Sequence, residues 1–116
     1  MKRTSTDQPN PTVPACWQRE STTACLRIEL ETGELHILPY NHLITAYCAK
    51  AADGPEILQI TFSSHEIRIE GHNLRDLVLG IQDFAIKWLR PVRERYRAVA
   101  SNRDGVITSV RVATVE

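Results

Sequence analysis

Histidine and cysteine are the residue types in this chain that could hold a metal ion or carry nucleophilic chemistry. A zinc site needs four converging ligands, usually supplied in close pairs, and no such pair occurs among Cys16, Cys25, Cys48 and the histidines. Cys48 and His42 are close in sequence, but a nucleophile and its base must also meet within hydrogen-bond distance. We therefore expect no metal site, no cofactor and no catalytic residue. The four histidines are His36, His42, His65 and His72.

The common catalytic and nucleotide-binding motifs are also missing from the sequence. It has no glycine-rich phosphate loop, no nucleophile elbow and no paired-histidine zinc motif. The odd number of cysteines, at long and irregular spacings, favours reduced thiols over a disulfide framework. No apolar run approaches the roughly 18 residues of a membrane span, and no signal peptide opens the chain. We expect a non-enzymatic, cytoplasmic protein without a membrane segment.

Basic side chains crowd the last part of the sequence. Residues 1–86 hold seven Lys and Arg against eleven Asp and Glu, whereas residues 87–116 hold seven against three. Arginine suits bidentate contacts with phosphate or carboxylate, so this region could bind nucleic acid or another polyanion. The alternative is a role in solubility and in pairing with acidic side chains, which the zero net charge favours. The candidate polyanion-binding residues are Lys87, Arg90, Arg93, Arg95, Arg97 and Arg103.

Charged residues alternate with apolar ones along the predicted strands and would decorate the outer face of a sheet. They could form a polar binding surface or a paired-carboxylate site. A sheet with one wet face carries the same pattern without any function, and exposed ion pairs contribute only ~0–1 kcal/mol each. We favour this second interpretation. The residues are Arg27, Glu29, Glu31, His36, Glu66, Arg68 and Glu70.

The longest amphipathic pattern covers residues 71–92. Wound as a helix, with Asn73 as its N-cap and Pro91 at its end, it gathers its apolar residues within roughly 140°. Leu79 and Ile86 stand seven apart and outside that arc, so a monomer would expose them unless another segment covers them. We interpret them as a second stripe for self-association. The main arc contains Leu74, Leu77, Val78, Ile81, Phe84, Ala85, Trp88, Leu89 and Val92.

A first β-hairpin is predicted over residues 24–38, where apolar and polar residues alternate with the period of a half-buried strand. Thr32-Gly33 would form a two-residue turn. That loop length places Ile28 opposite Ile37 and gathers the apolar residues on one face.

A second hairpin is predicted over residues 56–70, with a Ser63-Ser64 turn that places Ile60 opposite Ile67. Residues 42–50 between the hairpins fit a strand or a helix. We favour a strand, because isoleucine, threonine and tyrosine are strand-forming residues and the neighbouring segments are strands.

These elements predict an α+β fold. Residues 1–15 are expected to be a disordered tail because of their prolines and polar residues. Residues 16–104 would form one domain, an antiparallel sheet of four to six strands in a meander with one long C-terminal amphipathic helix on one face. Residues 105–116 are strand-like and could add one more strand. The order over residues 24–90, strands followed by a helix with a tryptophan, resembles in architecture the plan of pleckstrin-homology-type barrels.

We therefore expect a small non-catalytic interaction or assembly module that forms a homo-oligomer. Its partner-binding residues would be Leu79 and Ile86 on the helix and Val110 and Val112 on the C-terminal strand, which could join the sheet edge of another chain. Polyanion binding through the arginines is the first alternative. A pocket between helix and sheet that binds a small molecule is the second.

Overall fold

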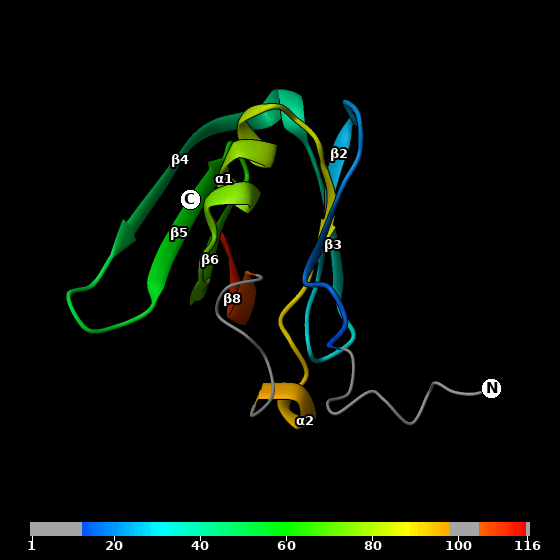
Figure 1. Ribbon diagram of the computed structural model, residues 1–116. Helices are drawn as coiled ribbons and strands as arrows, with labels where there is room; N and C mark the ends of the chain where they lie inside the picture. The colour runs from blue at the N-terminus through cyan, green and yellow to red at the C-terminus, as the bar shows by residue number, and fades with distance from the viewer. Residues whose placement is uncertain (1–12, 98–104, 116) are drawn as a thin grey trace.

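The computed structural model describes residues 13–97 and 105–115, and within them eight strands form two four-stranded sheets (Figure 1). The strand order is β1-β7-β2-β3 in the first sheet and β4-β5-β6-β8 in the second. The short 3-10 helix η2 joins β3 to β4, so the chain changes sheet there. The elements are β1 Trp17–Arg19, β2 Cys25–Glu29, β3 Leu35–Pro39, η2 Tyr40–His42, β4 Leu43–Lys50, β5 Glu56–Phe62, β6 His65–His72, α1 Arg75–Gln82, β7 Ile86–Leu89, α2 Glu94–Arg97 and β8 Val106–Thr114.

The predicted α+β fold, with one long helix packed across a single sheet, is wrong. The described chain is mostly β, and α1, with eight residues, is its longest helix. Trp88, expected on the long helix, lies in strand β7. The resemblance to the plan of pleckstrin-homology-type barrels depended on that helix and is not supported.

Residues 71–92 form several short elements instead of one helix. β6 runs on to His72, and α1 ends at Gln82. Phe84 then has a φ of 55°, in the left-handed region, which an α-helix cannot accommodate. Strand β7 follows and pairs with β1 on one side and with β2 on the other. Hydrogen bonding to two neighbouring strands outweighs the helical pattern, because periodicity and propensity are only local preferences.

Gly80 allows α1 to pack directly on β7. A Cβ atom at Gly80 would lie 2.7 Å from Cγ1 of Ile86 and closer still to its Cδ1. Ile86 is fully buried, so its side chain has little room to move away. Glycine in a helix costs ~1 kcal/mol relative to alanine, and at this position it permits the contact between helix and strand.

The first hairpin is present, but its register differs by one residue from the prediction. Ile28 lies opposite His36, and Glu29 lies opposite Leu35. Gly33, at a φ of 94°, completes a three-residue loop instead of a two-residue turn. Because a shift of one residue exchanges the two faces of a strand, Leu35 and Ile37 lie on the outer face.

Three other predictions about strands are confirmed. The second hairpin has the predicted register, with Ile60 opposite Ile67. Residues 42–50 are mainly strand β4, which pairs with β5. The strand-like C-terminal segment forms β8, which pairs antiparallel with β6 and so belongs to the second sheet.

The hydrophobic core lies between the inner faces of the two sheets. Figure 1 shows α1 between the sheets at the end where η2 connects them, and its Leu77 and Ile81 are buried. Tyr40 of η2 is also buried, and its hydroxyl donates a hydrogen bond of 2.6 Å to the carbonyl oxygen of Ile86. The largest buried strand side chains are Leu26, Ile28, Leu58, Ile60, Phe62, Ile67, Ile69 and Ile86.

Two parts of the sequence interpretation lie outside the described residues. These are most of the expected tail, residues 1–15, and the position of Arg103. Over residues 13–97 and 105–115, no helix is both long enough and apolar enough to cross a lipid bilayer.

Candidate protein-interaction surface

Large apolar side chains are exposed at the edges of the sheets. Two lie on β3 and two on β4, and these strands follow each other in the chain and form the outer edges of different sheets. Single exposed apolar residues are normal on a protein surface, and only contiguous exposed apolar surface marks contact sites in general. The exposed large apolar residues of the described chain are Leu35, Ile37, Ile44, Tyr47, Leu79, Phe84 and Val115.

Strand β4 has the most open edge of the two sheets. In the described chain it pairs with β5 alone, and in Figure 1 it forms the outer margin of the second sheet. Tyr47 lies on the outer face and is 68% exposed. Ala46 and Cys48 lie opposite the buried Ile60 and Leu58, on the inner face, and yet both are exposed. The first sheet therefore does not cover β4, and both of its faces are accessible.

Three of the four edge strands carry features that hinder pairing with another chain. β1 has only three residues and includes Arg19. β3 has five residues and ends at Pro39, and β8 carries the exposed Arg111 next to its central residue. β4 has eight residues, and its one charged residue is the terminal Lys50. Its only irregularity is a register shift between Leu43 and Thr45, at its other end.

The predicted helix stripe for self-association does not exist. Leu79 lies in α1 and is 38% exposed, but Ile86 lies in β7 and is fully buried. Their spacing of seven residues placed them on one stripe only if the helix continued past residue 82. Val110 and Val112 lie on β8 opposite Ile69 and Ile67 and are half-buried against the core.

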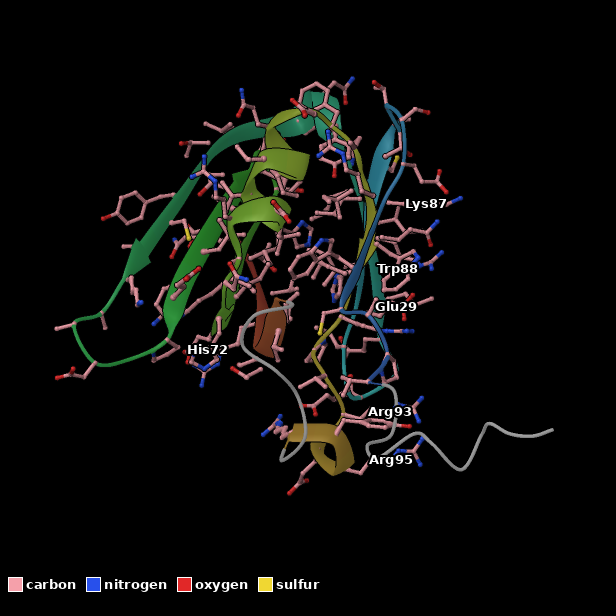
Figure 2. The ribbon with its side chains drawn as sticks, viewed as in Figure 1. Glu29, His72, Lys87, Trp88, Arg93 and Arg95 are labelled. Atoms are coloured by element: carbon pink, nitrogen blue, oxygen red, sulfur yellow. The ribbon has the colours of Figure 1, made fainter. Side chains whose placement is uncertain are left out.

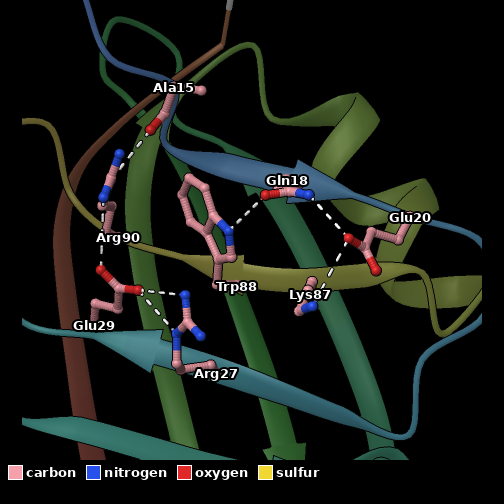
Figure 3. Close-up of polar contacts among 8 residues, drawn as sticks. All are labelled: Ala15, Gln18, Glu20, Arg27, Glu29, Lys87, Trp88 and Arg90. Carbon is pink, nitrogen blue, oxygen red and sulfur yellow. Dashed lines mark hydrogen bonds and ion pairs between the residues drawn. The ribbon is translucent and has the colours of Figure 1, made fainter.

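The arginine cluster is partly neutralised by carboxylates. Lys87 lies 3.9 Å from Glu20. Arg90 lies 3.7 Å from Glu29, and its guanidinium stacks 4.5 Å from the ring centre of Trp88 (Figure 3). Arg97 follows the same pattern, 3.5 Å from a carboxylate oxygen of Glu31.

Trp88 stands at the centre of this polar network on the outer face of the first sheet. Its indole nitrogen donates a hydrogen bond of 2.8 Å to Gln18, whose amide donates to Glu20 at 3.0 Å (Figure 3). Glu29 also accepts a hydrogen bond of 2.9 Å from Arg27. The charges on this face are therefore largely paired with one another. Arg27 and Glu29 lie on the wet face as predicted, whereas His36 lies on the inner face, opposite the buried Ile28.

A groove of about 700 Å³ lies beside the β2–β3 loop and α2. Arg93 and Arg95 line it, and both lie at the end of the molecule that carries α2 (Figure 2). Neither forms an ion pair within the described part of the chain, although Arg95 stacks 4.9 Å from the ring centre of Tyr96. Glutamates also line the groove, so its wall carries both signs of charge. They are Glu29, Glu31 and Glu94.

The thiols of Cys16 and Cys48 are not activated. Burial raises the pKa of Cys16. Partial desolvation, together with the nearby Glu56 carboxylate, raises the pKa of the more exposed Cys48. A raised pKa keeps a thiol protonated, and the protonated form is a poor nucleophile. Across the described ranges, His, Cys, Asp and Glu side chains nowhere gather in groups of three that could hold a metal ion.

Among the histidines, the rings of His36 and His65 lie 6.0 Å apart and meet edge to face. The two rings come from β3 and from the first residue of β6, and they connect the two sheets.

Comparison with known proteins adds no relationship: the chain matches no protein-family model, no curated protein and no solved structure.

Proposed function

We propose that this protein is a small non-catalytic interaction module that assembles with itself through the edges of its sheets. The observation that supports the proposal best is the edge strand β4, which is eight residues long, uncharged before Lys50 and exposed on both faces. Unpaired strand edges offer a row of backbone donors and acceptors to another strand. Apolar side chains on such an edge lose contact with water when it is covered, which favours association.

The proposal replaces the predicted stripe of Leu79 and Ile86 with strand edges. The predicted role of the C-terminal strand remains the alternative contact, because β8 is also an edge and carries Val110 and Val112. The exposed Arg111 makes β8 the less favourable edge, since two copies would bring this charge close to itself.

The cytoplasmic location expected from the sequence remains part of the proposal. Its support is that the three cysteines are free thiols, which suits a reducing compartment.

Light scattering on the purified protein, measured over a series of concentrations, tests self-association. We expect the mass to rise from monomer to a defined oligomer, and expect this rise to persist at high salt because the proposed contact is uncharged. A mass that stays at the monomer value up to the solubility limit would contradict the proposal.

Polyanion binding is the second candidate, and the exposed side chains of Arg93 and Arg95 support it. Three of the other cationic candidates are already near carboxylates, so the number of available charges is small. Strong binding of nucleic acid needs several phosphate contacts and weakens steeply with salt. If this candidate is correct, a single-stranded oligonucleotide will bind at low salt and lose affinity in the double variant R93A/R95A. Absence of binding at low salt would exclude it.

A further inference from the structure

We infer that β4 pairs antiparallel with β4 of a second copy, with Tyr47 at the two-fold axis. The second sheet of each copy, β4-β5-β6-β8, would then join its counterpart in one continuous eight-stranded sheet. This inference rests on the proposed function and names both the partner and the contact. Its support is that β4 is a long edge strand, that its register shift lies near one end, between Leu43 and Thr45, and that its one charge lies at the other end, on Lys50.

The choice of β4 follows from the comparison of the four edges. β1 is short, β3 ends in a proline and β8 carries an arginine next to its central residue, and each of these features opposes strand addition. β4 lacks such protection between Thr45 and Ala49. An edge strand of this length and composition would be prone to aggregation in a protein that remained a monomer.

The second copy fits this edge because an uncharged strand is complementary to itself. In a symmetric antiparallel pair, each residue meets a residue of the same strand. Across residues 45–49 this places no charge opposite a like charge. A strand of another protein could also pair with the edge, but every other copy of this chain carries a matching β4 at the concentration of the protein itself.

The register follows from two ends that cannot pair well. The shift between Leu43 and Thr45 disturbs the first end of β4, and Lys50 carries a charge at the other end. The regular and uncharged part is therefore residues 45–49, whose centre is Tyr47.

A two-fold axis perpendicular to the sheet places the inner faces of both copies on the same side of the joined sheet. Residues that oppose each other across the axis must then both have odd numbers or both have even numbers. An axis through Tyr47 meets this condition, because it places Thr45 opposite Ala49 and Ala46 opposite Cys48.

This arrangement would cover the surfaces that the monomer leaves open. The two Tyr47 rings would pack against each other on the outer face, and the exposed Ala46 and Cys48 would gain neighbours on the inner face. Cross-strand aromatic pairs are among the more stabilising pairs in sheets. The free backbone groups along β4 would also acquire hydrogen-bond partners.

Cysteine cross-linking tests the strand and the register together. In a C25S/C48S background, we expect Tyr47→Cys to form a disulfide-linked dimer under mild oxidation. Directly opposed residues in an antiparallel pair have Cα atoms about 4.5–5.5 Å apart, within the range that a disulfide spans. The matched control is Ile37→Cys on the edge strand β3, where the native side chain is 62% exposed, and it should not cross-link.

A charge variant supplies a second, independent measurement. Tyr47→Lys places two like charges at the axis and removes the aromatic contact, so we expect the dimer dissociation constant to rise by roughly tenfold or more. Ile37→Lys should leave it unchanged. Both native side chains are largely exposed, and circular dichroism should report folded protein for both variants.

The outcomes separate this inference from the proposed function. If the unmodified protein forms a dimer but Tyr47→Cys fails to cross-link, or Ile37→Cys cross-links equally well, self-assembly stands and the β4 contact is wrong. Persistence of the dimer in Tyr47→Lys would lead to the same conclusion. If the unmodified protein remains a monomer at all concentrations, both the proposed function and the inference fail.

Discussion

Replacement of Gly80 by alanine separates two descriptions of the chain. If residues 71–92 formed one helix with Gly80 on its polar side, Gly80→Ala would stabilise the protein by ~1 kcal/mol through helix propensity. In the structure, the new methyl group meets the side chain of Ile86, with Cγ1 at 2.7 Å and Cδ1 closer. Overpacking of a well-packed core costs roughly 1–3 kcal/mol. The net expectation is a loss of about 1 kcal/mol in the free energy of unfolding.

Chemical denaturation, monitored by tryptophan fluorescence, measures this difference. A double-mutant cycle with Ile86→Val sharpens the test, because valine lacks the Cδ1 atom nearest to the added methyl. Ile86→Val alone should cost roughly 0.5–1.5 kcal/mol. We expect the double variant to be more stable than the sum of the single effects by about 1 kcal/mol, since contacting residues are coupled. A Gly80→Ala variant that is more stable than the parent, with additive effects in the cycle, would refute the packing of α1 on β7.

Two further predictions concern Tyr40. Tyr40→Phe leaves the buried carbonyl oxygen of Ile86 without its 2.6 Å hydrogen bond, so we expect a loss of roughly 1–3 kcal/mol in denaturant unfolding, whereas Tyr47→Phe at the exposed position should change stability little. Burial also raises the pKa of the Tyr40 phenol above the usual value of 10.0. The unfolded chain then releases this proton before the folded protein does, so stability should fall as the pH rises above about 10. Tyr40→Phe should reduce that fall, and an unchanged slope in this variant would argue against the assignment.

The parts of the fold that the sequence predicted correctly are governed by contacts between nearby residues. The second hairpin has its predicted register because apolar residues alternate on both strands and the Ser63-Ser64 turn fixes the loop length. The first hairpin differs by one residue because its loop holds three residues, 31–33, and ends at Gly33 with a positive φ. Both loops are short and polar in sequence, and alternation alone does not choose between two-residue and three-residue connections.

The long helix was predicted wrongly because its pattern has a second interpretation. Leu89 belongs to the main apolar arc of the predicted helix and is buried in the strand as well. Burial of Leu89 therefore does not distinguish the two structures, whereas Ile86 lies outside that arc and is buried only in the strand. The strand is selected by pairing with β1 and β2, which come from residues 17–29, far away in the sequence. Such long-range pairing leaves no local signal in the sequence. The positive φ of Phe84, which ends any continuous helix, is unusual for a residue other than glycine and is evident only in the structure.

The candidate surface shows a related limit of sequence patterns. The strand over residues 42–50 was predicted, but its position at the edge of a sheet was not, because strand order depends on the whole chain. The alternation of apolar and polar residues along a strand allows two interpretations of an apolar residue: it lies in the core, or it is a single exposed residue without a role. Leu35, Ile37 and Tyr47 fit neither category, since they are exposed and lie on strand edges.

A third category, the contact between chains, accounts for Tyr47 and its neighbours more simply. Natural edge strands usually carry charges, prolines or irregularities, because unprotected edges aggregate. β1, β3 and β8 follow this rule and β4 does not. Where a sequence respects a physical rule at three positions and violates it at a fourth, the violation is expected to serve a function. A symmetric pairing of β4 supplies one, because it removes the open edge by placing it at the centre of a larger sheet.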